Sequence, residues 1–155
     1  MTPWRFSSTD DPAPILALIR ACFAYMEGRI DPPSSMQRLT PEAVRAQAEA
    51  GEVWVIGPRE APLACVFFTP KPGALYIGKL AVDSAARGQG YARMLVDLAE
   101  ARARALDLPA LELQTRVELV ENHATFRALG FEKTGETAHP GFDRPTSFRF
   151  RKVVE

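Results

Sequence analysis

The short segment Arg87–Ala92, which reads Arg-Gly-Gln-Gly-Tyr-Ala, constrains the fold more than any other part of the sequence. It follows an apolar run that ends at Asp83, and it opens a long stretch with helical periodicity. The apolar positions of that stretch are Tyr91, Met94, Leu95, Leu98, Ala101 and Ala105. Leu108–Pro109 ends it, and a further apolar run, Leu111–Thr115, follows. We therefore predict a strand, a helix and a strand joined by a right-handed parallel crossover, which is typical of an α/β fold with a mixed sheet.

The other elements are predicted from apolar periodicity, capping residues and turns. Further strands are expected at Trp4–Ser7, Val53–Ile56, Leu63–Thr69, Ala74–Val82, Glu132–His139 and Ser147–Lys152. Two helices are expected to follow the capping residues Asp11 and Thr40, and a third covers Glu121–Leu129. Pro12 fits the first turn of the first helix. The polar stretch Glu27–Ser35 is too irregular for a regular element.

Length and charge exclude several classes of protein. The 155 residues fit one domain, spanning 1–155. Lys and Arg number 19, as do Asp and Glu, so the formal net charge is zero and a nucleic-acid binder is not expected. No apolar run approaches the roughly 18 residues of a membrane span, and Met1–Arg5 lacks an apolar signal core. We expect a cytoplasmic protein without a membrane partner, and the choice between monomer and homodimer stays open.

The two cysteines, Cys22 and Cys65, lie between apolar residues and have no metal-ligand spacing around them. Buried free thiols are therefore expected rather than a disulfide or a catalytic nucleophile. The sequence gives no reason to expect a metal site.

Gly88 and Gly90 are expected to form a binding loop for an anion. Glycines adopt backbone conformations that other residues resist, and the first N–H groups of the helix that follows have no partner within it. With the helix dipole and the Arg87 guanidinium, these N–H groups suit a pyrophosphate. A dinucleotide fingerprint would need a glycine in place of Arg93, and an ATP-type loop would need Gly-Lys-Ser/Thr in place of Tyr91–Ala92. A turn that merely joins strand to helix is the remaining alternative.

The segment Lys79–Leu95 resembles motif A of the GNAT superfamily of N-acetyltransferases, whose signature is Gln/Arg-x-x-Gly-x-Gly/Ala. Downstream, Asn122–Phe131 is similar to the family's motif B, a short helix that ends in Leu-Gly-Phe. The order of the expected elements agrees with the family along most of the chain. The resemblance implies a mixed, mostly antiparallel sheet of about seven strands, with a splayed parallel pair and about four helices.

The resemblance also implies acetyl-CoA as the co-substrate and indicates how it would bind. The backbone of Leu80, Ala81 and Val82 would pair with the pantetheine arm, which inserts between the splayed strands. The pyrophosphate would be held by the glycine loop and the start of the helix: Arg87, Gly88, Gln89, Gly90, Tyr91, Ala92 and Arg93. Asn122 and Phe126 would lie along the arm near the thioester.

Phe126 departs from the family, because many members have a tyrosine there that protonates the leaving thiolate. A thiol has a pKa of about 8.5, so its thiolate is a tolerable leaving group without that acid. Tyr25, Tyr76 and His123 are substitutes by residue type, although a surface position on the short helix is the favoured interpretation of His123.

Acetyl transfer also needs a base, because the incoming amine must be neutral to attack. The carboxylates that could serve are Glu27, Asp31, Glu112 and Glu118. Glu27 is the preferred catalytic candidate, because the family builds its acceptor site between the first two helices. Arg29 and Asp31 either meet charged groups of the acceptor or form a local ion pair. Pro140–Thr146 either folds over the acceptor or makes a rigid connection.

Together these features predict an N-acetyltransferase that moves the acetyl group of acetyl-CoA to a primary amine of a small molecule or peptide. Direct attack in a ternary complex is the expected mechanism. A non-catalytic module that binds or senses acyl-CoA is the alternative, and a structural domain with an incidental glycine loop is a third possibility. The identity of the acceptor amine is not predictable, because a fold does not fix a substrate.

Overall fold

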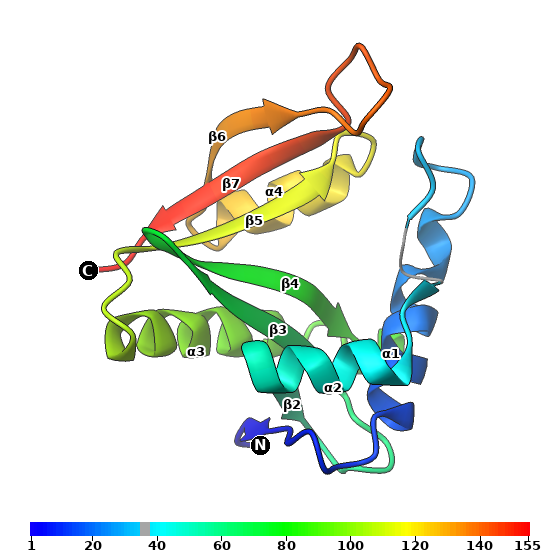
Figure 1. The fold of residues 1–155 in the computed structure, drawn as a ribbon, viewed down its shortest axis with the longest axis vertical. Coiled ribbons are helices and arrows are strands. Elements are labelled where there is room, and N and C mark those ends of the chain that lie inside the picture. Colours follow the sequence, from blue (N-terminus) through cyan, green and yellow to red (C-terminus); the bar gives the residue numbers. More distant parts are fainter. Residues whose placement is uncertain (35–37) are drawn as a thin grey trace.

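A computed structural model describes residues 1–34 and 38–155, and Figure 1 shows its fold. A seven-stranded sheet has the order β1-β2-β3-β4-β5-β7-β6. Its strands are β1 Trp4–Arg5, β2 Glu52–Ile56, β3 Ala64–Lys71, β4 Ala74–Val82, β5 Ala110–Arg116, β6 Glu132–Thr137 and β7 Ser147–Val153. The β4–β5 pair is parallel, and the other five pairs are antiparallel. The predicted mixed sheet of seven strands with a parallel pair is confirmed.

Three helices cover the N-terminal half of the sheet: α1 Ala13–Phe23, α2 Pro41–Ala50 and α3 Tyr91–Ala105. α1 and α2 pack on one face, where Val53, Cys65 and Ala81 point into their shared core. α3 packs on the opposite face, together with Phe68 and Leu75. Because both faces are buried, β3 begins with five consecutive buried residues instead of an alternating pattern.

The C-terminal half of the sheet has one helix packed against it, α4 Val120–Ala128, which lies behind β5 and β7 in Figure 1. Phe150 of β7 is fully buried on that side, and its ring centroid lies 6.3 Å from that of Phe126 in α4. The opposite face is polar, and there Glu112 of β5 pairs with Arg151 of β7 at 3.2 Å. β5 accordingly alternates between buried and more exposed residues, as expected for a half-covered sheet.

Two helices differ in detail from the prediction. The N-cap of α1 is Pro12, although the Asp11 carboxylate still accepts a hydrogen bond from the Ala13 N–H at 3.0 Å. In α3 the predicted apolar positions Ala101 and Ala105 are exposed. The buried residues of α3 are Leu95, Val96, Ala99 and Ala103. Alanines occupy several sides of this helix, so apolar periodicity alone did not determine its orientation.

The connection between α1 and α2 begins with a short 3-10 helix, η1 Ala24–Met26, and continues in turns, as expected for an irregular stretch. Ser35, the last residue of that predicted stretch, lies outside the described residues. No helix within residues 1–34 and 38–155 is long and apolar enough to span a membrane.

Candidate active site

The parallel strands β4 and β5 separate soon after they meet. Their register contains two pairs, Leu75 with Leu111 and Tyr76 with Glu112, although β4 continues to Val82. The two strands therefore enclose a V-shaped gap that opens toward their carboxyl ends, as Figure 1 shows. Beyond its second pair, β4 makes no further pair with β5 among the residues that the structure describes, and an unpaired strand edge of this kind is what an extended ligand can pair with.

A β-bulge lies on β4 at the point where the gap opens. Gly78 pairs with Phe67 and Ala81 pairs with Cys65, so Lys79 and the residue after it stand opposite a single residue of β3. Lys79 has a φ of 51°, in the left-handed region that non-glycine residues rarely adopt. Burial lowers the pKa of its ammonium group. The bulge turns the main chain of β4 and increases its twist beside the gap.

The glycine loop lies at the end of this strand. Gly88 and Gly90 have φ values of 81° and 84°, and a Cβ added at either would meet no atom within 4 Å. Gly90 is the N-cap of α3, and no side chain among the described residues caps the first N–H groups of this helix. Arg87 and Gln89 are both exposed. The loop therefore leaves the N-terminus of α3 open, a geometry that suits an anion; that this loop binds one stays a prediction.

Two of the residues predicted to bind the pantetheine arm, Leu80 and Val82, lie on β4 beyond its last pair with β5. Leu80 and Val82 are half-buried on β4, whereas the side chain of Ala81 is buried in the α1–α2 core, which leaves only its main chain for a ligand. Arg93 reaches from α3 to α4, with Nη2 3.5 Å from the carbonyl oxygen of Ala128. This contact spans the two helices that flank the gap.

The structure places the three residues that could replace the missing general acid in different surroundings. His123 is buried, its Nε2 lies 2.9 Å from the Arg116 carbonyl oxygen and its ring packs on Phe148, so the surface position expected for it is wrong. Burial and the neighbouring Glu112 raise the pKa of the Tyr76 hydroxyl. Tyr76 also lies at the closed end of the gap, in the last β4–β5 pair. Tyr25 lies elsewhere, on η1.

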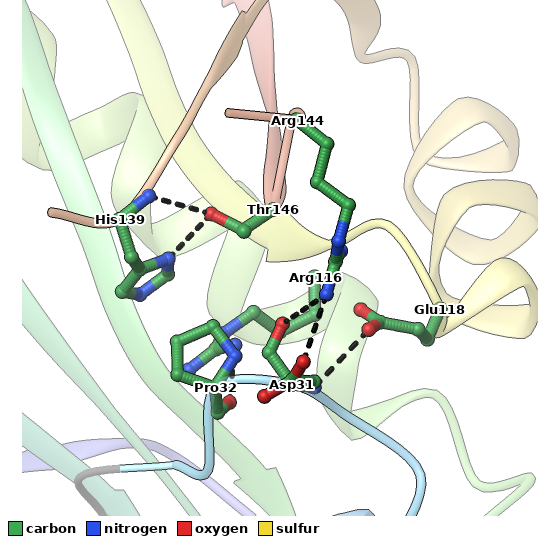
Figure 2. A network of polar contacts seen from close by, with 7 residues as sticks. All are labelled: Asp31, Pro32, Arg116, Glu118, His139, Arg144 and Thr146. Carbon is green, nitrogen blue, oxygen red and sulfur yellow. Dashed lines mark hydrogen bonds and ion pairs between the residues drawn. The ribbon is translucent and has the colours of Figure 1, made fainter. Parts of the chain in front are cut away.

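The connection between α1 and α2 is tied to the C-terminal half of the sheet, as Figure 2 shows. The Asp31 N–H donates to Glu118 Oε2 at 3.1 Å, and the Asp31 carboxylate pairs with Arg144 at 3.0 Å. Arg116 at the end of β5 donates to the carbonyl oxygen of Pro32 at 2.6 Å. Burial lowers the pKa of this arginine, against the opposing effect of Glu118 and Asp31. We call the connection, residues 24–34, the strap.

The strap also contacts α4. Both Nη atoms of Arg29 bind the Glu121 carboxylate, at 2.7 and 3.1 Å. Met26 and Ile30 pack with Leu119, the residue before the helix. Arg29 and Asp31 thus pair with residues far along the chain, Glu121 and Arg144, so these contacts are not the local ion pair that was one of the two alternatives. Arg144 brings the predicted Pro140–Thr146 connection onto the strap.

The four candidate bases occupy different surroundings. Glu112 is paired with two arginines of β7, and Asp31 is paired with Arg144. Glu118 uses one oxygen to accept from the strap, and its Oε1 is buried without a hydrogen-bond partner in the described part of the chain. Glu27 lines a cavity of about 500 Å³. The cavity is lined by Arg20, Phe23, Ala24, Met26, Glu27, Gly28, Ile30, Pro33 and Ser34.

Sequence reasoning missed the contacts between the strap and the C-terminal half. Arg29 and Glu121 are 92 positions apart, and Arg144 and Asp31 are 113 apart. No spacing rule relates residues at such separations, because only the folded sheet brings them together. Within residues 1–34 and 38–155, no cluster of three or more His, Cys, Asp or Glu side chains has a geometry that could hold a metal ion.

Comparison with known proteins identifies this arrangement. Residues 15–131 match the profile of the Acetyltransferase (GNAT) family. The chain belongs to this family. No curated protein matches the sequence.

Solved GNAT structures share the fold across nearly the whole chain. Aminoglycoside 6'-acetyltransferase type Ii is 16% identical, with 100% of this chain and 98% of that chain covered at a TM-score of 0.76. A GNAT-family acetyltransferase of Staphylococcus aureus is 12% identical, with 99% of each chain covered at 0.75. A GNAT-family acetyltransferase of Elizabethkingia anophelis, solved with acetyl-CoA bound, is 14% identical, with 99% and 97% covered at 0.69. At these identities the likeness shows the fold alone.

Proposed function

We propose that this GNAT protein transfers the acetyl group of acetyl-CoA to a primary amine, by direct attack in a ternary complex. One observation carries the proposal. The uncovered glycine loop and the uncapped N-terminus of α3 lie at the end of β4, whose edge is left without a β5 partner by the V-shaped gap. The open helix N-terminus suits a pyrophosphate, and the strand edge beside it suits the pantetheine arm that is attached to that pyrophosphate.

The chain's own residues then have distinct tasks. Arg87 and the N–H groups from Gly88 to Arg93 hold the pyrophosphate, while the main chain of Leu80 and Val82 pairs with the arm. A free N–H of β4 near the bulge stabilises the carbonyl oxygen as negative charge develops on it during attack. Relatives from Elizabethkingia anophelis and Bacillus subtilis were solved with acetyl-CoA and with CoA, which supports this choice of co-substrate.

The acceptor enters from the strap side in this proposal. The cavity beside Glu27 combines apolar side chains with this carboxylate and with Arg20, so it suits an amine attached to an apolar or mixed body. Glu27 accepts the proton that the ammonium must lose before the nitrogen can attack.

Release of free thiol from acetyl-CoA tests the proposal. The protein is screened against a panel of amines that includes polyamines, amino acids, aminoglycosides and peptides, and at least one amine should stimulate thiol release. Arg87→Glu serves as the inactive reference, because it places a negative charge at the phosphate loop. Arg45→Glu on the exposed side of α2 is the matched control, and it should retain activity.

A non-catalytic acyl-CoA module is the second candidate, and Phe126 favours it because a phenylalanine side chain carries no proton to donate. Both candidates predict a rise in melting temperature with CoA, since a ligand at 100 times its dissociation constant adds about 2.7 kcal/mol. Thermal stabilisation by CoA without thiol release for any amine would favour the module. Stabilisation together with release would establish the enzyme.

A further inference from the structure

The proposed reaction leaves one proton unassigned. Breaking the C–S bond gives a CoA thiolate, and the Phe126 ring at the corresponding position of α4 cannot protonate it. That ring is half-buried and packs edge-on against Phe131 of the core, with centroids 5.9 Å apart. Any protein group that protonates the sulfur must therefore be a residue other than Phe126. The inference below rests on the proposed function.

Tyr25 brings a hydroxyl group to α4 from the strap. Its Oη lies 3.4 Å from Nδ2 of Asn122, in the first turn of α4. An amide nitrogen only donates, so the phenol oxygen accepts this hydrogen bond and its own hydrogen stays available for another acceptor. Asn122 and Phe126 are four residues apart and share a face of the helix, with Cβ atoms about 5–6 Å apart. The Tyr25 hydroxyl thus lies one helical turn from the position that lacks an acid.

Neighbouring contacts fix the tyrosine in this place. The Arg29 guanidinium lies 5.5 Å from the centroid of the Tyr25 ring, and the same guanidinium binds Glu121 with two hydrogen bonds. Met26, the next residue on η1, is buried against Leu119. Tyr25 itself is 40% exposed, so a substrate can reach it.

The other two substitutes are less well placed. His123 is 5% exposed, and its Nε2 is engaged with a main-chain carbonyl group. Tyr76 belongs to the last β4–β5 pair, at the closed end of the V-shaped gap, and its hydroxyl is bonded to the main chain of Gln114. Tyr25 lies on the strap, which joins the two halves of the molecule beside the open end.

We infer that Tyr25 is the proton donor to the leaving thiolate and that Asn122 positions it. The amine nitrogen bonds to the thioester carbon, the C–S bond breaks and its electron pair passes to sulfur. The Tyr25 hydroxyl transfers its proton to sulfur, which gives free CoA. The phenolate recovers a proton from solvent, which has received the one lost by the amine nitrogen. The product is the acetylated amine, and no other reactant is required.

Steady-state kinetics on the intact chain tests this assignment. Tyr25→Phe should lower kcat by about 10- to 100-fold while the KM values for acetyl-CoA and amine stay within about twofold, because only a proton-transfer group is removed. Adding Phe126→Tyr to that variant should recover at least about half of the decrease in log kcat, because the new phenol lies on the same face of α4 as Asn122. Asn122→Ala should lower kcat by a few-fold only, since it keeps the Tyr25 hydroxyl and removes one hydrogen bond that positions it.

Tyr76→Phe is the matched control, because it removes a phenol hydroxyl from the other end of the gap, and it should keep kcat within about twofold. A Tyr25→Phe enzyme with unchanged kcat would overturn the inference and leave the proposed function intact. So would a loss that appears in KM alone, or one that Phe126→Tyr fails to repair while CoA still stabilises the variant. A wild-type protein that releases no thiol with any amine would overturn the proposed function and this inference together.

Discussion

The two ends of the proposed site are built in different ways. At the cofactor end, the glycine loop and the start of α3 present main-chain N–H groups, and a Cβ at Gly88 or Gly90 would meet no protein atom within 4 Å. At the acceptor end, the strap is held by side chains from distant parts of the chain, such as Arg29 with Glu121 and Asp31 with Arg144. The first end depends on backbone conformation and the second on particular side-chain pairs.

This difference has a consequence for variation. A main-chain site tolerates many side chains around it, provided that its glycines are kept. The strap can change its charged partners in pairs, and each exchange alters the wall beside the acceptor cavity. We therefore expect cofactor binding to be sensitive to backbone geometry, and acceptor choice to be sensitive to charge and shape on the strap.

The largest effect is expected on stability, at the Arg102–Glu52 ion pair, which lies at neither end of the proposed site. Arg102 of α3 donates two hydrogen bonds of 2.8 Å to Glu52, which is 4% exposed. Arg102→Leu leaves this carboxylate buried and unpaired, which should lower the free energy of unfolding by about 3 kcal/mol at pH 7 in urea titrations. Cofactor affinity and turnover per folded molecule should be unchanged. A loss below about 1 kcal/mol would contradict this view of the pair.

The same pair should show a defined pH dependence. Burial raises the pKa of Glu52, but hydrogen bonds from Arg102 and Trp54 outweigh burial and hold it below the ordinary value of 4.5. A carboxyl group whose folded pKa is lowered stabilises the protein above its unfolded pKa, and this contribution is lost as the pH falls through the folded value. The stability difference between wild type and Arg102→Leu should therefore shrink below about pH 4.5.

The next effect tests the cofactor end. Gly90→Val places a β-branched residue at a φ of 84°, and Gly73→Val does the same at 80° in the β3–β4 turn. Each should lose about 1–2 kcal/mol of stability from the left-handed backbone. Only the Gly90 variant should bind CoA more weakly in calorimetry, by about 30- to 100-fold, because its side chain stands where the anion approaches. Equal CoA affinities in the two variants would show that the glycine loop is not part of the CoA-binding site.

Glu27→Gln tests the chemistry at the acceptor end. It should reduce turnover by at least about tenfold and leave CoA affinity unchanged, because the amide cannot accept the ammonium proton. Glu49→Gln on the exposed side of α2 is the control and should retain full turnover. A pH–rate profile of normal shape in the Glu27 variant would rule out this residue as the base.

The smallest effect concerns the strap itself. Arg29→Gln breaks an exposed ion pair, so it should raise the KM for the acceptor by only about two- to fourfold, with CoA affinity unchanged. The exchanged pair, Arg29→Glu with Glu121→Arg, should restore the original KM. The effect should fade in about 0.5 M salt, where exposed charges are screened. A change in CoA affinity would show that the two ends are not independent.

Local features made the cofactor end predictable from sequence. The glycine loop, its arginine and the helix that follows lie within adjacent positions, and each has a physical meaning that does not depend on the rest of the fold. The Thr40 cap of α2 is likewise local, and its side chain accepts from the Ala43 N–H as expected. The order of strands and helices followed from periodicity and turns.

Other features depended on tertiary packing and were not predictable. The orientation of α3 was missed because Ala99, Ala101, Ala103 and Ala105 differ in burial but not in residue type. His123 was assigned to a surface position, because the sequence does not show that its ring is buried and hydrogen-bonded to the Arg116 carbonyl group. The contact between Tyr25 and Asn122 joins residues 97 positions apart, so only the folded chain reveals it.

The position of β7 has a consequence for how the chain is made. This strand comes last in the sequence but lies between β5 and β6, pairing with both. During synthesis on the ribosome, β5 and β6 emerge first, each with an edge that only Ser147–Val153 can cover. The nascent protein therefore exposes unpaired strand edges until translation passes this segment.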